Sequence, residues 1–175
     1  MAIYLVRHTP TILPKTVCYG QLDVELQKPY SLLFDAILEQ LPTQINTIYS
    51  SPLIRCKELA NFIAKKNNTA NLNFDDRLKE LSFGDWEGKV WDIIPPKELN
   101  PWMEDFVNMA VPNGESFKDL YSRSIAFFQT ITNTTNNVVV ISHAGVIRSV
   151  LCYLNNKSLV DAFSFKCDFG EVIRI

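Results

Sequence analysis

Ala2-Ile3-Tyr4-Leu5-Val6-Arg7-His8-Thr9 carries five apolar residues that run directly into Arg-His-Thr, and Pro10 follows. A short apolar run containing Ile, Tyr and Val predicts a buried strand. Because proline cannot donate a ladder hydrogen bond, the strand should end just before Pro10. Arg7 and His8 are therefore expected at the carboxyl end of a core strand, where open α/β sheets bind their ligands.

The second histidine of the chain follows a similar apolar run. The chain has two histidines, His8 and His143, and the latter lies in Val138-Val139-Val140-Ile141-Ser142-His143-Ala144-Gly145. Either histidine alone could equally be a hydrogen-bonded residue at the margin of the core. Because both follow a predicted strand and each has an arginine nearby in sequence, Arg7 or Arg148, we expect them to share a site.

Length and composition are those of an ordinary globular protein. The chain has 175 residues, of which 47% are hydrophobic and 21% charged, and we expect a single domain over 1–175. The net charge of −2 gives no general electrostatic reason to expect a nucleic acid or an anionic membrane as partner. Phosphate chemistry would therefore need a local cationic pocket.

Cysteine usage and apolar patterning predict a cytoplasmic protein without a metal site. Cys18, Cys56, Cys152 and Cys167 lie far apart and show no zinc-like spacing, which favours free thiols in a reducing compartment. The apolar stretches are too short to span a membrane. Arg7 also interrupts the first apolar run too early for a secretory signal peptide.

Strands and helices alternate along the chain. Strands are expected at 2–6, 47–50, 71–74 and 138–142, and helices at 31–41 with Ser31 as N-cap, 52–67, 98–109, 117–133 and 144–154. A closing hairpin is expected from 163–167 and 171–175, turning at Asp168-Phe169-Gly170. This order predicts an α/β fold, a three-layer α/β/α sandwich with a mostly parallel central sheet and an antiparallel edge. The long loop 10–29 follows Arg7-His8 directly and should line the same site.

Side chains that could bind or transfer a phosphoryl group follow the predicted strands. Arginine forks match phosphate oxygens and keep their charge. A neutral imidazole can attack phosphorus to form a phosphohistidine, and a carboxylic acid can protonate the leaving oxygen. The residues available at one end of the sheet are Arg7, His8, Arg55, Glu80 and His143.

Some of these assignments have alternatives that the residues alone leave open. Arg55 could be a surface cation on a helix face, and Arg148 is expected to be structural. Glu80 competes with Asp85 and Glu87 for the role of acid. Three tryptophans are expected to pack in the core or a lid rather than to stack on a nucleobase: Trp86, Trp91 and Trp102.

The motifs together resemble the histidine phosphatase superfamily, also called phosphoglycerate-mutase-like. The matching segments are Leu5-Val6-Arg7-His8-Thr9, Ser50-Ser51-Pro52-Leu53-Ile54-Arg55, Leu78 to Gly88, and Ser142-His143-Ala144-Gly145-Val146-Ile147-Arg148. The resemblance implies that His8 is the nucleophile, and that Arg7, Arg55 and His143 bind the phosphoryl oxygens. It further implies that Glu80 is the acid and then the base, with no metal or cofactor.

A narrower resemblance concerns the substrate. Cys18-Tyr19-Gly20-Gln21-Leu22-Asp23-Val24, Asn113-Gly114-Glu115-Ser116-Phe117 and Phe163-Ser164-Phe165 are similar to segments of α-ribazole phosphatases of cobalamin biosynthesis. The implied substrate is the small phosphomonoester α-ribazole 5′-phosphate. The corresponding substrate contacts would be Thr9, Tyr19, Gly20, Gln21 and Ala144.

Other functions stay open on the sequence alone. A broad-specificity phosphatase or a phosphoglycerate mutase would share the fold, although Thr9 and Pro10 depart from the Gly-Glu that usually follows the catalytic histidine of mutases. A catalytically inactive phospholigand-binding module has no need for both His8 and Glu80. A metalloenzyme using His8 and His143 would lose turnover to chelators. The oligomeric state is also open.

Overall fold

One mixed sheet forms the centre of the computed structural model, which describes residues 2–68 and 70–175. In the described residues the strand order is β3-β2-β4-β1-β5. The strands are β1 (Ile3–Arg7), β2 (Thr47–Ser50), β3 (Asn71–Phe74), β4 (Val138–Ser142) and β5 (Val172–Arg174). The pairs β1–β4, β2–β4 and β2–β3 are parallel, whereas β5 runs antiparallel to β1. The predicted parallel sheet with an antiparallel edge is confirmed.

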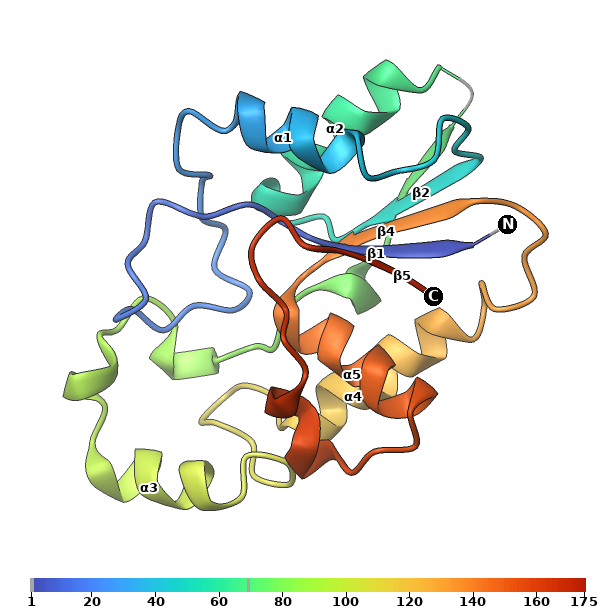
Figure 1. The fold of residues 1–175 in the computed structure, drawn as a ribbon. Coiled ribbons are helices and arrows are strands. Elements are labelled where there is room, and N and C mark those ends of the chain that lie inside the picture. The colour runs from blue at the N-terminus through green and yellow to red at the C-terminus, as the bar shows by residue number, and fades with distance from the viewer. Residues whose placement is uncertain (1, 69) are drawn as a thin grey trace.

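Helices cover both faces of this sheet, as Figure 1 shows. On one face lie α1 (Ser31–Leu38) and α2 (Ile54–Lys66), and on the other α4 (Phe117–Phe128) and α5 (Ala144–Leu154). The short α3 (Pro96–Glu104) lies apart from the sheet. The predicted three layers are thus confirmed. No helix in the described ranges is both long enough and apolar enough to cross a membrane.

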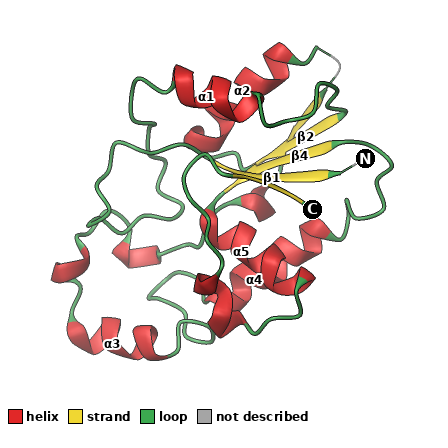
Figure 2. Cartoon of the chain, viewed as in Figure 1, coloured by secondary structure: helices red, strands yellow, loops and turns green. Residues whose placement is uncertain are grey.

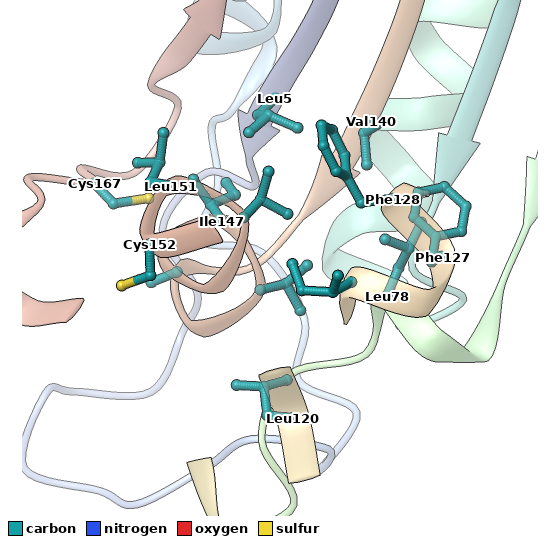
Figure 3. Packing of buried hydrophobic residues seen from close by; sticks show 14 of the residues in the cluster. Leu5, Leu78, Leu120, Phe127, Phe128, Val140, Ile147, Leu151, Cys152 and Cys167 are labelled. Carbon is teal, nitrogen blue, oxygen red and sulfur yellow. The ribbon is translucent and has the colours of Figure 1, made fainter. Parts of the chain in front are cut away.

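The strand β4 explains why the layers hold together. All five of its residues are buried, and its side chains alternate between the two helical layers. Val138 and Val140 pack with α4 and α5, whereas Val139 and Ile141 pack with α1 and α2. In Figure 3, Val140 points from the sheet into the cluster that also holds Ile147 of α5. Each large aliphatic side chain buried in this way contributes roughly 1.5–3 kcal/mol.

The parallel strands direct the functional segments to one edge. Because β1, β2 and β4 are parallel, residues that follow their carboxyl ends meet at the same edge of the sheet. Arg7 and Ser142 are register partners at that edge. Figure 2 shows the long loops gathered beyond it, opposite the end where the two termini lie.

The predicted closing hairpin is wrong in its first strand and its pairing, although the second strand is present as β5. Residues 159–164 form a 3-10 turn, and β5 pairs with β1 in the register Tyr4↔Arg174 and Val6↔Val172. The physical reason is that the outer edge of β1 would otherwise expose unpaired backbone groups, which β5 satisfies. The preceding segment instead covers the core that includes α5, where Ala162 and Cys167 are buried.

Several helix boundaries also differ from expectation. Tyr30, not Ser31, is the N-cap of α1, because its carbonyl accepts the first helical bond from Phe34 N. The end of α1 tightens into shorter turns after Leu38. The helices α3 and α4 likewise end at Glu104 and Phe128, before the residues predicted.

Candidate active site

His8 lies immediately after β1 and is almost fully buried, with 3% of its surface exposed. Its Nδ1 is 2.7 Å from the carbonyl oxygen of Thr9, which can only accept, so Nδ1 carries the hydrogen. Burial, followed by the positive charge of Arg55, lowers the pKa of His8 well below its usual value. A neutral ring protonated on Nδ1 leaves a lone pair on Nε2, which is the form that can attack an electrophile.

His143 is the N-cap of α5, and its ring packs edge-on against His8 with the centroids 5.1 Å apart. Its Nδ1 accepts from Arg55 Nε at 3.3 Å, so its Nε2–H donates to Ser51 Oγ at 2.8 Å. Burial, then the charge of Arg55, lowers the pKa of His143 well below its usual value. Both histidines are therefore neutral near pH 7.

Arg55 is fully buried at 0% exposure, which excludes the alternative of a surface cation. Its Nη1 donates to the carbonyl of Leu22 at 2.9 Å, and its Nη2 donates to the carbonyl of Gly20. The loop 10–29 thus folds over the helix that carries Arg55. A buried charge is costly without a partner of opposite sign, and carbonyl oxygens compensate it only in part.

Arg7 supplies the second guanidinium of the site. Its Nη1 donates to the carbonyl of Cys167 at 2.6 Å, and its Cζ lies 3.7 Å from the ring centre of Phe169. Its buried Nε has no hydrogen-bond partner among the described residues. Burial lowers its pKa, since desolvation opposes the charged form. Among the residues that the structure describes, neither Arg7 nor Arg55 forms a salt bridge. Two guanidinium groups that form no ion pair in the described residues, together with two neutral imidazoles, make a site for an anion.

Of the three candidate acids Glu80, Asp85 and Glu87, the structure brings Glu80 to this site. Its Oε1 accepts from Leu81 N at 3.0 Å, and its Oε2 accepts from Gly145 N at 3.1 Å in the first turn of α5. Its two competitors are occupied elsewhere. Asp85 accepts from the side chain of Asn113. Glu87 accepts from the backbone N–H groups of Gly20, Gln21, Leu22 and Phe83.

A cavity of about 290 Å³ joins these groups, and we call it the phosphate cavity. It is lined by Arg7, His8, Lys15, Val17, Tyr19, Arg55, Glu80, Trp91, His143, Asp168 and Phe169. Three of these residues come from the loop 10–29, as predicted. A second cavity of about 180 Å³, the aromatic cavity, shares Tyr19 and Glu80 with it. Its other lining residues are Leu81, Phe83, Trp102, Phe106, Phe117, Leu120, Ala144, Gly145, Arg148 and Phe163.

Comparison with known proteins assigns the family. The model of the histidine phosphatase superfamily (branch 1) matches residues 3–175. The chain belongs to the histidine phosphatase superfamily. Membership of this superfamily supports a phosphatase activity, as the sequence predicts.

Relatives within the superfamily differ in the substrates that their names state. Phosphoserine phosphatase 1 of Hydrogenobacter thermophilus is 29% identical over 173 residues, covering 95% of this chain and 82% of that protein. Adenosylcobalamin/alpha-ribazole phosphatase of Escherichia coli K12 is 27% identical over 135 residues, covering 69% of this chain and 64% of that protein. The structure of mycobacterial glucosyl-3-phosphoglycerate phosphatase has a TM-score of 0.86 at 22% identity, over 99% of this chain and 88% of that one. That likeness shows the fold alone.

The expected substrate contacts of this histidine phosphatase divide into two groups. Tyr19 lines both cavities, with its hydroxyl 2.8 Å from Thr11 Oγ1, and Ala144 lines the aromatic cavity. Thr9 is fully buried and lines neither cavity.

Gly20 and Gln21 also lie behind the cavities instead of lining them. Gly20 packs against the backbone of Leu81, where a Cβ would lie 1.7 Å from the carbonyl oxygen. Gln21 donates through Nε2 to the carbonyl of Glu80 at 3.1 Å. Both residues therefore support Arg55 and Glu80 from behind.

Several residues near the site were missed by sequence reasoning. Ser51 has a visible signal, because it lies in the matching Ser-Ser-Pro segment and contacts His143. Lys15, Asp168 and Phe169 reach the phosphate cavity from loops, where no local pattern marks them.

The remaining predictions concern the tryptophans, Arg148, the cysteines and a metal site. The tryptophans do pack together, with Trp86 buried and the rings of Trp91 and Trp102 stacked at 6.1 Å. Arg148 donates through Nε to the carbonyl of Phe165 at 3.2 Å, and it also lines the aromatic cavity. All four cysteines are buried and free. No group of three or more His, Cys, Asp or Glu side chains in residues 2–68 and 70–175 is placed to hold a metal ion.

Proposed function

We propose that the protein is a phosphomonoester hydrolase that acts through a phosphohistidine on His8. The observation that supports this most is the neutral His8, protonated on Nδ1, beside two guanidinium groups that form no salt bridge in the described part of the chain. Arg7, Arg55 and His143 would hold the phosphoryl oxygens, and the two arginines neutralise the charge that spreads over them in the transition state. Glu80 lines the same cavity and is available for proton transfer.

The reaction divides into two steps with balanced protons. In the first step His8 Nε2 forms a bond to phosphorus, the bond from phosphorus to the ester oxygen breaks, and Glu80 gives its proton to that oxygen. In the second step water attacks phosphorus, Glu80 takes a proton from that water, and the N–P bond breaks. Inorganic phosphate leaves, and Glu80 is again ready to donate.

The substrate that we propose is α-ribazole 5′-phosphate, converted to α-ribazole in cobalamin nucleotide-loop assembly. The support is the aromatic cavity, which adjoins the phosphate cavity through Tyr19 and Glu80. The leaving group of a phosphate bound at His8 would extend past Glu80 into that cavity. Its walls include Phe106, Phe117 and Phe163, which suit a planar apolar base.

A second candidate is phosphoserine or another phosphate ester that carries a carboxylate, such as 3-phosphoglycerate. One observation favours it: Arg148 is the cationic side chain among the residues that line the aromatic cavity, and its hydrogen bond to Phe165 uses Nε, not the terminal nitrogens that would bind a carboxylate. The relative from Hydrogenobacter thermophilus bears the name phosphoserine phosphatase.

Turnover measured side by side separates these candidates. The substrates are α-ribazole 5′-phosphate, phosphoserine, 3-phosphoglycerate and a sugar bisphosphate, compared by kcat/KM. A preference for α-ribazole 5′-phosphate supports the first candidate, whereas a preference for the carboxylate esters supports the second.

The covalent route has its own test. Substrate labelled in the phosphoryl group, quenched without acid, should leave on the wild type a label that survives alkali and is lost in acid. His8→Ala should abolish both label and turnover while the fold remains, because the buried His8 ring lines the phosphate cavity and lies outside the apolar clusters on the two faces of the sheet. Normal turnover without any trapped label would contradict the phosphohistidine.

A further inference from the structure

The arginine at position 123, on α4, uses every donor that its guanidinium has. Nε and Nη2 bind the two carboxylate oxygens of Glu115, each at 2.8 Å. The remaining donors bind the backbone. Nη1 donates to the carbonyls of Arg77 at 2.9 Å and Lys79 at 2.5 Å, and Nη2 donates to the carbonyl of Glu80 at 2.8 Å. Five contacts thus converge on one short segment and one carboxylate.

Glu115 binds the same segment from its other side. Its Oε2 accepts from Ser82 N at 2.9 Å, and its own backbone N–H donates to the carbonyl of Ser82 at 2.9 Å. The backbone of residues 77–82 is therefore held both before and after Glu80. A partly exposed ion pair contributes little to folding, and the Arg123 and Glu115 side chains are 19% and 23% exposed. The planar fork, in contrast, imposes a fixed geometry on the groups it binds.

We propose that Arg123 and Glu115 are positioning residues that fix the backbone of Glu80 so that its carboxyl group reaches the ester oxygen. The proposal rests on the role of Glu80 as acid in the proposed function. Neither residue lines the phosphate cavity or the aromatic cavity. Among the proposed catalytic residues, their hydrogen bonds in the described part of the chain reach the backbone of Glu80 and not His8, Arg7, Arg55 or His143. Burial is the main cause of the lowered pKa of His143, the charge of Arg123 is a minor one, and Arg123→Lys keeps that charge.

Displacing a reacting group by about 1 Å can cost about 100-fold in rate. That cost should depend on the leaving group, because only a poor leaving group needs the proton of Glu80. We call the contacts of Arg123 and Glu115 with residues 77–82 the clamp. Its loss should therefore slow the hydrolysis of an alkyl phosphate and leave the hydrolysis of an aryl phosphate nearly unchanged. A general structural defect would slow both equally.

The variants are Arg123→Lys, which keeps the charge but loses the planar fork, and Glu115→Gln, which keeps the size but loses the charge. The matched control is Arg77→Lys, because the side chain of Arg77 pairs with Asp75 at 2.6 Å and does not touch residues 79–82. Each variant is assayed with ribose 5-phosphate and with p-nitrophenyl phosphate.

We expect Arg123→Lys to lower kcat for the alkyl ester by about 30-fold to 100-fold with little change in KM. The rate for the aryl ester should stay within about threefold, and Arg77→Lys should leave both rates unchanged. Adding Arg123→Lys to Glu80→Gln should cause no loss beyond that of Glu80→Gln alone, since the position of residue 80 no longer matters once its acid is gone. Glu115→Gln should show the same selectivity with a smaller effect.

The single variant Glu80→Gln distinguishes failure of the proposed function from failure of the positioning proposal. If Glu80→Gln slows the two esters equally, the assignment of Glu80 as acid fails, and the proposed function must be revised. If Glu80→Gln slows only the alkyl ester but both clamp variants slow neither ester, or slow both esters equally, the positioning proposal alone is overturned.

Discussion

The two neutral histidines make the stability of the protein depend on pH in a way that the structure sets. In the folded state burial lowers the pKa of both His8 and His143 well below their usual value of 6.5. In the unfolded chain each imidazole takes up a proton near pH 6.5. Below that pH the unfolded state binds more protons than the folded state, so the free energy of unfolding falls as pH falls.

The expected size of the effect follows from linkage. Each imidazole that stays neutral in the folded state contributes a loss of about 1.4 kcal/mol per pH unit once the pH lies below the unfolded pKa. For two such groups the loss between pH 7.5 and pH 5.5 is about 2.7 kcal/mol. This is a large share of the roughly 5–15 kcal/mol that stabilises a typical domain.

Urea unfolding at half-unit steps of pH measures this loss directly. Phosphate buffers must be avoided, because an anion that binds the folded state would add its own stabilisation. Asp75 and Asp119, whose pKa values are lowered by their hydrogen bonds to Arg77 and Ser116, titrate below this pH window and leave it undisturbed.

Two variants provide the control for this measurement. His8→Gln and His143→Gln should each reduce the pH-dependent loss to about 1.4 kcal/mol, whatever they do to the stability at neutral pH. A total loss under about 1 kcal/mol in the wild type, or a loss that neither substitution reduces, would refute the conclusion that both rings are neutral when buried.

Four further substitutions have expected outcomes. Arg7→Ala and Arg55→Ala should each lower kcat/KM by several orders of magnitude, and a loss below about tenfold, roughly 1.4 kcal/mol, would show that the arginine does not contact the phosphoryl group. Gly145→Ala should lower turnover of alkyl phosphates by about 100-fold, because its Cβ would lie 2.3 Å from Glu80 Oε1 and displace the carboxyl group. The melting temperature should fall as well, because the same Cβ would lie 2.7 Å from Cδ2 of the buried Leu120. Unchanged turnover would show that Glu80 moves aside freely. Ser116→Ala should cost about 1 kcal/mol in a denaturant titration, since it removes the capping box of α4, and an unchanged midpoint would contradict that role.

Local periodicity was sufficient to predict the part of the fold that carries the chemistry. The apolar runs that end at Arg7 and Ser142 are buried strands, and both histidines follow them to the same edge of the sheet. The reason is that parallel strands end at the same edge of a sheet, so two apolar runs that are each followed by a histidine bring the two histidines close together. The resemblance to the superfamily then selected Glu80 over Asp85 and Glu87, and the structure places Glu80 alone of the three in the phosphate cavity.

The parts that sequence reasoning missed depend on contacts between distant segments. Arg55 is buried because the loop 10–29 covers its guanidinium, which donates to the carbonyls of Gly20 and Leu22. Helical periodicity cannot predict this contact, because the loop is distant from the helix in sequence. The pairing of β5 with β1 is likewise a choice between two edges, which the composition of either strand does not decide. The aromatic cavity combines residues as far apart as Tyr19 and Phe163.

The tryptophan cluster makes the intrinsic fluorescence of the protein sensitive to events at the candidate active site. The chain contains three tryptophans, and all of them lie in the cluster beside the two cavities. Trp91 lines the phosphate cavity and Trp102 lines the aromatic cavity, while Trp86 is packed within 6.5 Å of both rings. Intrinsic emission therefore comes from the loops around the site and not from the sheet. A ligand that enters either cavity should change the emission without any attached dye, and far-ultraviolet circular dichroism follows the sheet and helices separately.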